Sequence, residues 1–298
     1  MSSDFLYDIL CCPQCRSKLH DHQGIPVCIK CNMHPEQSGR MVDFRPLTPK
    51  LPLHFARYTQ QLHEAAGHAM SDVPVDWRVQ KVVEMAKTLE GGGVCLEIGG
   101  ADGPMTRVLE SMYSTVITID FAESFLRRIE AKTEKTICLC GDAHFLPIVD
   151  KSVDLVICSE VLEHVSIPTQ LLLEIRRVLK PGGKCILSVP HEAPDRRMRR
   201  WRAADFLAER NSHITFFNGI TLNKLLFRMG FNIIQFHYLS EPAKLTVSLR
   251  RLYFLLRRKL HPSYLLCMME IMEDPDVYWS SFASVLGAEK VGHVIQNR

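Results

Sequence analysis

Short apolar runs alternate with segments of helical periodicity through the middle of the chain. The apolar runs are nearly continuous, which is typical of strands that helices cover on both faces of a parallel sheet. Between them, apolar residues recur three or four positions apart, the spacing of an amphipathic helix. The expected strands are 94–98, 115–119, 136–139, 153–159 and 184–189, and the expected helices between them are 104–111, 123–132 and 168–179. The alternation predicts a doubly wound α/β domain.

The same pattern extends in both directions. A helix is expected at 221–229, where a glycine ends it, and a strand follows at 231–237. Residues 277–286 are apolar enough to form a seventh strand. Upstream, 76–89 has strong helical periodicity and 53–69 has a weaker one. We therefore expect a Rossmann-like, seven-stranded and mostly parallel sheet.

The first 48 residues follow neither period and are marked instead by cysteines. Two Cys-x-x-Cys pairs are separated by twelve residues, a spacing that lets four thiolates surround a zinc ion in a closed structural site. So short a segment buries little core, and the metal is expected to supply part of its folding free energy. Cys11 and His34 are alternative ligands, but the regular pair spacing disfavours them. The predicted ligands are Cys12, Cys15, Cys28 and Cys31.

These patterns divide the chain into three parts. A small zinc ribbon is expected at 1–48, a proline-punctuated linker with helices at 49–90, and a larger α/β domain at 91–298. The larger domain contains two basic insertions, at 191–212 and 241–276.

Each insertion allows two interpretations. The first places five arginines around Trp201, which suits gripping of phosphate and stacking on a base, or a solvated helix whose arginine stems cover apolar surface. In the second, 244–261 has the pattern of a basic amphipathic helix. Such a helix either makes peripheral contact with an anionic membrane or caps the domain.

Composition narrows the class of protein. The chain has 298 residues, of which 46% are hydrophobic and 23% charged, values ordinary for a soluble globular protein. The net charge of +3 is too small to indicate nucleic-acid binding by itself. Eleven cysteines, several of them in apolar strands, favour a reducing cytoplasmic setting. We expect neither a signal peptide nor a membrane-spanning segment.

A turn of small residues follows the first strand of the larger domain. Gly99, Ala101 and Gly103 let the backbone approach a ligand closely, and Glu97 precedes them. The spacing is not the G-x-G-x-x-G dinucleotide fingerprint, and the chain has no G-x-x-x-x-G-K-[ST] phosphate cradle. The expected ligand therefore carries little negative charge.

The ends of the next strands supply the remaining contacts. Asp120 is placed to accept the two hydroxyls of a ribose, and Phe121 to lie against a purine. Asp142, followed by Ala143, is placed to accept from an exocyclic amine, and Ser159 ends the fourth strand. S-adenosylmethionine combines a ribose and a purine with a cationic end, and that cation favours a nearby acid.

Residues 94–190 resemble a class I S-adenosylmethionine-dependent methyltransferase of the type 11 group. The resemblance implies the Rossmann-like fold and this cofactor. Ala101 replaces the usual second glycine, and we expect a negative φ at that position because alanine disfavours a positive one. The matching segments are 97–103, Asp120, 141–143, 160–164 and 179–183.

Residues 4–46 resemble the zinc-ribbon module of the tRNA-methyltransferase-activator type. The matching segments are 6–10, ahead of the first cysteine pair, and 42–46, which closes the module. The resemblance implies a scaffold or a partner-binding surface.

The acceptor side is marked by Glu160, Glu163 and His164. This Glu-x-x-Glu-His segment resembles the metal motif of ubiquinone-biosynthesis O-methyltransferases and small-RNA 2′-O-methyltransferases, which implies Mg²⁺ at these residues. The alternative is metal-free chemistry, because the segment is widespread among methyltransferases. His191 and His213 are the other general-base candidates.

His191, His213 and the helix at 222–230 are similar to those of small-molecule methyltransferases, which implies O-methylation of a small-molecule, sugar or lipid-type acceptor. The alternative is RNA methylation, with the zinc module and the arginine cluster binding the substrate. A third interpretation, a non-enzymatic cofactor sensor, is disfavoured by the intact acidic residues. The Asn/Asp-Pro-Pro-aromatic motif of amine methylation is missing after the fourth strand, which argues against N-methylation.

Overall fold

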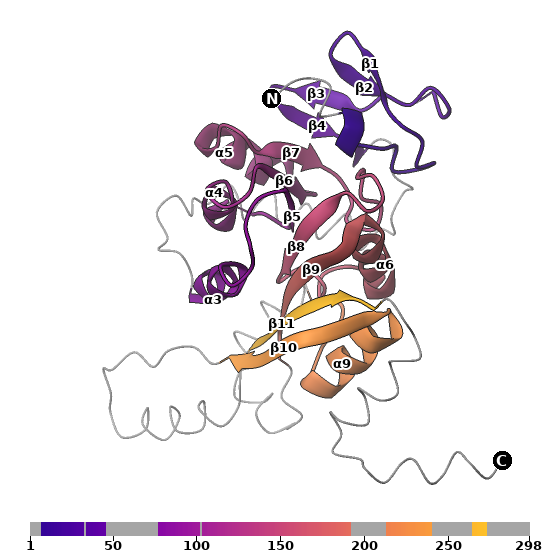
Figure 1. Ribbon diagram of the computed structural model, residues 1–298. Coiled ribbons are helices and arrows are strands. Elements are labelled where there is room, and N and C mark those ends of the chain that lie inside the picture. Colours follow the sequence, from indigo (N-terminus) through magenta and orange to yellow (C-terminus); the bar gives the residue numbers. More distant parts are fainter. Residues whose placement is uncertain are drawn as a thin grey trace, which may run out of the picture.

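A computed structural model describes residues 7–32, 34–45, 77–101, 103–191, 213–239 and 264–272. Within them, nine strands form one mixed sheet in the order β10-β11-β9-β8-β5-β6-β7-β4-β3 (Figure 1). Strands β5 to β11 form the predicted seven-stranded, mostly parallel sheet, and the α/β prediction is confirmed.

The five central strands lie close to their predicted positions. β5 and β8 have the predicted bounds, whereas β9 begins five residues early because the Lys-Pro-Gly-Gly segment is extended and continues directly into the strand. Their bounds are β5 (Val94–Ile98), β6 (Thr115–Asp120), β7 (Ile137–Cys140), β8 (Val153–Ser159) and β9 (Leu179–Pro190).

The last two strands pair differently from the sequence expectation. β11 (Tyr264–Ile271) lies antiparallel between β9 and β10 (Phe231–Leu239). The seventh strand therefore comes from within the predicted insertion 241–276, since its apolar run Leu265 to Met269 is buried in the sheet. Residues 277–286, expected to form that strand, lie outside the described residues, as do 53–69 and 244–261.

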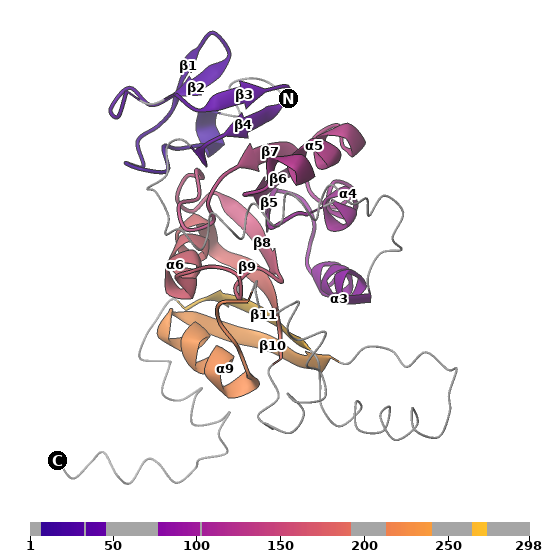
Figure 2. The ribbon, with the colours of Figure 1, turned by 180° about the vertical axis from the view of Figure 1, so that it is seen from behind.

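Helices cover both faces of the sheet (Figures 1 and 2). α3 (Trp77–Ala86), α4 (Pro104–Leu109) and α5 (Glu123–Lys132) lie on one face, and α6 (Pro168–Val178) and α9 (Gly219–Arg228) lie on the other. Leu171, Leu172 and Ile175, on the inner face of α6, are fully buried, as the helical spacing predicted. In the described part of the chain, no helix has both the length and the hydropathy needed to cross a bilayer.

The N-terminal segment contains two small hairpins. They are built from β1 (His20–His22) with β2 (Ile25–Val27), and β3 (Glu36–Ser38) with β4 (Met41–Asp43). β4 pairs in parallel with β7, so the hairpin extends the large sheet and covers an edge that β7 would otherwise expose (Figure 1).

Candidate active site

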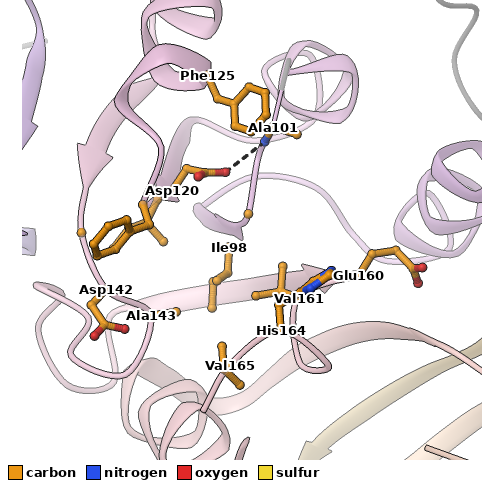
Figure 3. A pocket seen from close by; sticks show the side chains of 14 residues that line it. Ile98, Ala101, Asp120, Phe125, Asp142, Ala143, Glu160, Val161, His164 and Val165 are labelled. Carbon is orange, nitrogen blue, oxygen red and sulfur yellow. Dashed lines mark hydrogen bonds between the residues drawn. The ribbon is translucent and has the colours of Figure 1, made fainter. Parts of the chain in front are cut away.

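The chain reverses its winding direction between β5 and β8, and a cavity of about 270 Å³ opens there. It lies at the carboxyl ends of the parallel strands, where open α/β sheets bind ligands (Figure 3). Six of the nine predicted cofactor residues line it. The lining residues are Ile98, Gly99, Ala101, Ile119, Asp120, Phe121, Phe125, Gly141, Asp142, Ala143, Glu160, Val161, His164 and Val165.

The turn after β5 is shaped by its backbone. Gly99 has a φ of 77°, and a Cβ built there would lie 2.3 Å from Val161 Cγ2. Ala101 also adopts a left-handed conformation, with a φ of 44°, so the expected negative φ is wrong. Its amide donates to Asp120 Oδ2 at 3.3 Å, which helps to hold a conformation that costs an alanine about 1 kcal/mol.

Asp120 ends β6 and points into the cavity (Figure 3). Besides the Ala101 amide, its carboxylate accepts the Ala122 amide at 2.8 Å. Burial raises the pKa of Asp120 to about 6, although backbone donors partly oppose the shift. A carboxylate at this position has the acceptor capacity that the ribose prediction requires.

Asp142 follows β7 and is almost completely buried, with 1% of its surface exposed. Its Oδ1 accepts the His144 amide at 2.9 Å. Its Oδ2 is buried without a hydrogen-bond partner among the described residues, although Asp142 lines the cavity. A buried oxygen of this kind needs a donor, and the exocyclic amine of a purine is one.

Three predicted cofactor residues are not among the residues that line the cavity. Glu97 is buried and accepts the Thr106 hydroxyl, and burial followed by the charge of Asp120 raises its pKa to about 7. Ser159 Oγ lies 2.9 Å from Ser188 Oγ, and Gly103 precedes α4. Their predicted contact with the cofactor stays a prediction.

A second group of polar side chains lies beside the cavity. One ligand atom each from Glu163, His164 and His213 lie within 4.8 Å of one another. The rings of His164 and His213 are 4.7 Å apart, centre to centre. Backbone bonds bring the two segments together, since Ile214 and Thr215 both donate to the Glu163 carbonyl, at 2.8 and 3.1 Å.

The electrostatics of this group follow from its burial. Both carboxylate oxygens of Glu163 are buried without a hydrogen-bond partner in the described part of the chain. Burial, reinforced by the charge of Glu160, raises the pKa of Glu163 well above its usual range. Burial also lowers the pKa of His213, which favours a neutral imidazole.

Glu160 belongs to a different set of contacts. Its carboxylate accepts the Ser188 hydroxyl at 2.9 Å and pairs with Arg78 Nη1 at 3.4 Å, pointing away from the cavity centre (Figure 3). The structure therefore groups His213, rather than the expected Glu160, with Glu163 and His164. Residue 160 also has a positive φ of 57°.

His191 lies apart from that cluster. It forms a bridge with Phe217 and packs against Tyr238, with ring centres 5.7 Å apart. It does not line the cavity.

A family model described as a methyltransferase domain matches residues 69–236, more than half of the chain. The chain belongs to this methyltransferase family. Together with its relatives, the match identifies an S-adenosylmethionine-dependent methyltransferase.

Two relatives show how far the methyltransferase resembles characterised proteins. It is 30% identical to a biotin biosynthesis bifunctional protein BioHC of Cellvibrio japonicus, over 53% of this chain and 30% of the relative. It is 29% identical to a malonyl-[acyl-carrier protein] O-methyltransferase of Methylococcus capsulatus, over 40% of this chain and 46% of the relative. The chain thus spans less than half of either relative.

Two solved structures share the fold. The N-methyltransferase NodS of Bradyrhizobium japonicum, in complex with S-adenosyl-L-homocysteine, is matched over 72% of this chain and 100% of its own, with 16% identity and a TM-score of 0.54. The second is a complex between the Haloferax volcanii Trm112 methyltransferase activator and a methyltransferase. One chain of that complex is matched over 76% of this chain and 100% of its own, with 17% identity and a TM-score of 0.58.

The four predicted zinc ligands of the methyltransferase come together as expected. One sulfur each from Cys12, Cys15, Cys28 and Cys31 lie within 4.8 Å of one another, a donor set that fits zinc. Cys11 instead directs its thiol to the Ile148 carbonyl, 3.2 Å away. Among the described residues, His34 is not part of the group.

Several cavity residues of the methyltransferase were missed by sequence reasoning. Most are apolar and lie at strand ends or in the loops that follow, where the pattern does not distinguish a ligand contact from a core position. Phe125 carried one usable signal, because it lies on the first turn of the helix that follows Asp120. The missed residues are Ile98, Ile119, Phe125, Gly141, Val161 and Val165.

Proposed function

We propose that this methyltransferase transfers the methyl group of S-adenosylmethionine to a hydroxyl of a small-molecule, sugar or lipid-type acceptor. The observation that carries the proposal is the cluster of Glu163, His164 and His213 beside the cofactor cavity. Methyl transfer to an alcohol needs a group that removes or weakens the hydroxyl proton, and these residues are suited to that task.

The cavity supports one orientation of the cofactor. Asp142 Oδ2, which has no hydrogen-bond partner among the described residues, suits the adenine amine, and Asp120 suits the ribose hydroxyls. His164 and Glu160 line another part of the cavity wall. A cofactor bound in this way would direct its methyl-bearing end toward the wall that holds His164, next to which His213 lies.

His213 has the properties of a general base. Burial lowers its pKa, so the imidazole is neutral and able to accept a proton at neutral pH. Its neighbour Phe216 lies with its ring centre 6.4 Å away and is partly exposed, as is Ile214. These apolar side chains favour an acceptor with an apolar portion.

The same three residues also fit a divalent cation. Glu163 offers two buried oxygens that find no hydrogen-bond partner in the described ranges, and such a carboxylate is stabilised by a bound cation. One carboxylate with two imidazoles suits a transition ion better than the predicted Mg²⁺, which prefers oxygen ligands. A bound cation would lower the pKa of the acceptor hydroxyl.

The amino-terminal module supports a structural zinc site. Its four thiols suit zinc, and we retain the likeness to the activator-type zinc ribbon as part of this proposal. RNA methylation, the alternative function, depends on an arginine cluster that lies outside the described residues, as does the predicted membrane helix. A cytoplasmic location stays a prediction from cysteine usage.

The test uses the purified full chain, methyl-labelled S-adenosylmethionine, and a cell extract separated into RNA, lipid and small-molecule fractions. We expect base-stable label in the lipid or small-molecule fraction, and loss of at least about 100-fold of the rate in His213→Ala because general-base catalysis contributes that much. His237→Ala, at an exposed position on β10, is the matched control. Label confined to RNA would overturn the acceptor class.

Chelation distinguishes the two proposed roles of the Glu163, His164 and His213 cluster, which are general-base catalysis and cation binding. If Glu163, His164 and His213 hold a cation, dialysis against EDTA abolishes turnover and Mn²⁺ restores it, while S-adenosylhomocysteine binding is unchanged. Full turnover after chelation would leave His213 as a base and remove the cation from the proposal. Zinc content measured in parallel verifies that the cysteine site has kept its metal.

A further inference from the structure

His144 lies behind Asp142 and is not used by the site described above. It is buried, with 1% of its surface exposed. Its Nδ1 lies 2.6 Å from Asp142 Oδ1, and its Nε2 lies 3.1 Å from the backbone nitrogen of Ile167, the residue before α6. The imidazole is therefore held between the cofactor cavity and the start of a helix.

These two contacts determine the tautomer of His144. A backbone N–H only donates, so Nε2 must accept from Ile167 and carry no proton. Nδ1 then carries the proton of a neutral imidazole and donates to Asp142 Oδ1. The assignment follows from the hydrogen-bond network.

The tautomer in turn orients the Asp142 carboxylate. Oδ1 accepts both the His144 ring N–H and the His144 backbone amide, at 2.6 and 2.9 Å. Oδ2 is left as the oxygen without a partner in the described part of the chain. Asp142 lines the cavity, so a donor that reaches this wall would meet a buried acceptor that no described residue satisfies.

We propose that His144 is a positioning residue that determines the base selectivity of the methyl-donor site, by holding Asp142 so that Oδ2 receives the amino group of a 6-aminopurine. The inference rests on the cofactor orientation given under the proposed function. Asp142 touches the base, and His144 acts through it. A 6-oxopurine would place an acceptor against an acceptor and bind poorly.

The test compares S-adenosylhomocysteine with S-inosylhomocysteine, which carries a 6-oxo group, by isothermal titration calorimetry. The wild-type protein should prefer the adenosyl compound about 10- to 100-fold, the range expected when a buried polar group loses its partner. In Asp142→Asn, the two donors of His144 hold the amide oxygen, and the amide NH₂ faces the base. That variant should therefore prefer the inosyl compound.

The role of His144 is isolated by adding His144→Ala to each background. In His144→Ala alone, the preference for the adenosyl over the inosyl compound should be at least about fivefold smaller than in the wild-type protein, since the Asp142 carboxylate gains freedom to turn. In the double variant, the inosyl preference of Asp142→Asn should largely disappear. A residue with a merely structural role would weaken both ligands equally and leave their ratio unchanged.

Gln170→Ala is the matched control. Gln170 donates to the backbone carbonyl of His144 at 3.2 Å, so its loss loosens the same loop without touching the imidazole. Its selectivity should match that of the wild-type protein. Should His144→Ala fail to fold, nitrogen-15 spectra of the wild-type imidazole give a second test, in which Nε2 must be unprotonated.

The outcomes separate this inference from the proposed function. Absence of S-adenosylhomocysteine binding to the wild-type protein would overturn both. Selective binding by wild type with the same ratio in His144→Ala, or an adenosyl preference retained in Asp142→Asn, would overturn the role of His144 alone.

Discussion

Asp120 shows how burial and backbone donors act together on one carboxylate. Burial raises its pKa to about 6, while amides of Ala101 and Ala122 stabilise the charged form. An ionised carboxylate accepts two hydroxyls, whereas its protonated form loses an acceptor. In its predicted role as the ribose ligand, Asp120 would therefore hold the ribose best when ionised.

Cofactor affinity should consequently depend on pH. Because the predicted ribose contact requires the ionised form, the affinity for S-adenosylhomocysteine should be constant well above pH 6 and fall by up to about tenfold per pH unit below it. Calorimetric titrations between pH 5 and 8 measure this. Asp120→Asn should bind about tenfold more weakly at pH 8 and lack the inflection near pH 6. An unchanged inflection in this variant would assign it to another group.

At the scale of elements, the turn from β5 into α4 is constrained by β8. Gly99 combines a φ of 77° with a would-be Cβ 2.3 Å from Val161, a residue of the loop after β8. Gly92 has a comparable φ of 95°, but nothing lies within 4 Å of the place its Cβ would occupy. Alanine at Gly92 would therefore meet only the cost of the left-handed backbone, whereas alanine at Gly99 would also meet a steric overlap.

Substitution at these glycines should have unequal effects. Gly92→Ala should lower the free energy of unfolding by about 1–2 kcal/mol, the cost of the left-handed conformation. Gly99→Ala should lower it by about 1–3 kcal/mol more, because the new methyl group overlaps Val161. Urea unfolding measures both, and Val161→Ala added to Gly99→Ala should recover part of the excess. Equal losses in the two single variants would show that Val161 moves aside freely.

At the scale of the whole molecule, the cysteine-bearing module is joined to the methyltransferase sheet next to β7 and the loop that follows it, which carries Asp142. β4 pairs with β7, and the Cys11 amide donates to the Pro147 carbonyl at 3.0 Å. Arg16 donates to the Leu146 carbonyl and pairs with Glu174 on α6, both at 2.8 Å. The contacts at β7, Leu146 and Pro147 flank Asp142 in the chain, so the cysteine site and the cavity share a structural support.

Loss of a metal from the four-cysteine site should therefore alter the cofactor site. We expect removal of the metal from the cysteine site itself, for example in Cys12→Ser, to speed hydrogen exchange in 137–149 and to weaken S-adenosylhomocysteine binding at least about fivefold, as for two coupled sites. Mass-spectrometric hydrogen exchange localises the effect, and β10 with β11 at the opposite edge of the sheet is the internal control. Faster exchange confined to 7–45, with unchanged affinity, would contradict the coupling.

The sequence was most informative where a feature is local. Continuous apolar runs located β5 and β8 to the residue, and cysteine spacing selected the four sulfurs that come together. Both signals depend on neighbours in the chain. The same reasoning failed at Ala101, whose left-handed φ is held by the hydrogen bond that its amide donates to a residue nineteen positions away.

The sequence by itself determined the order of strands and helices, the methyl-donor chemistry and the cysteine site, because periodicity and motif spacing are properties of adjacent residues. Only the tertiary structure decided that β4 extends the sheet, that β11 supplies the seventh strand, and that His213 joins Glu163 and His164. It also placed His144 between Asp142 and α6. Those arrangements depend on contacts between segments far apart in the chain, which a linear pattern does not encode.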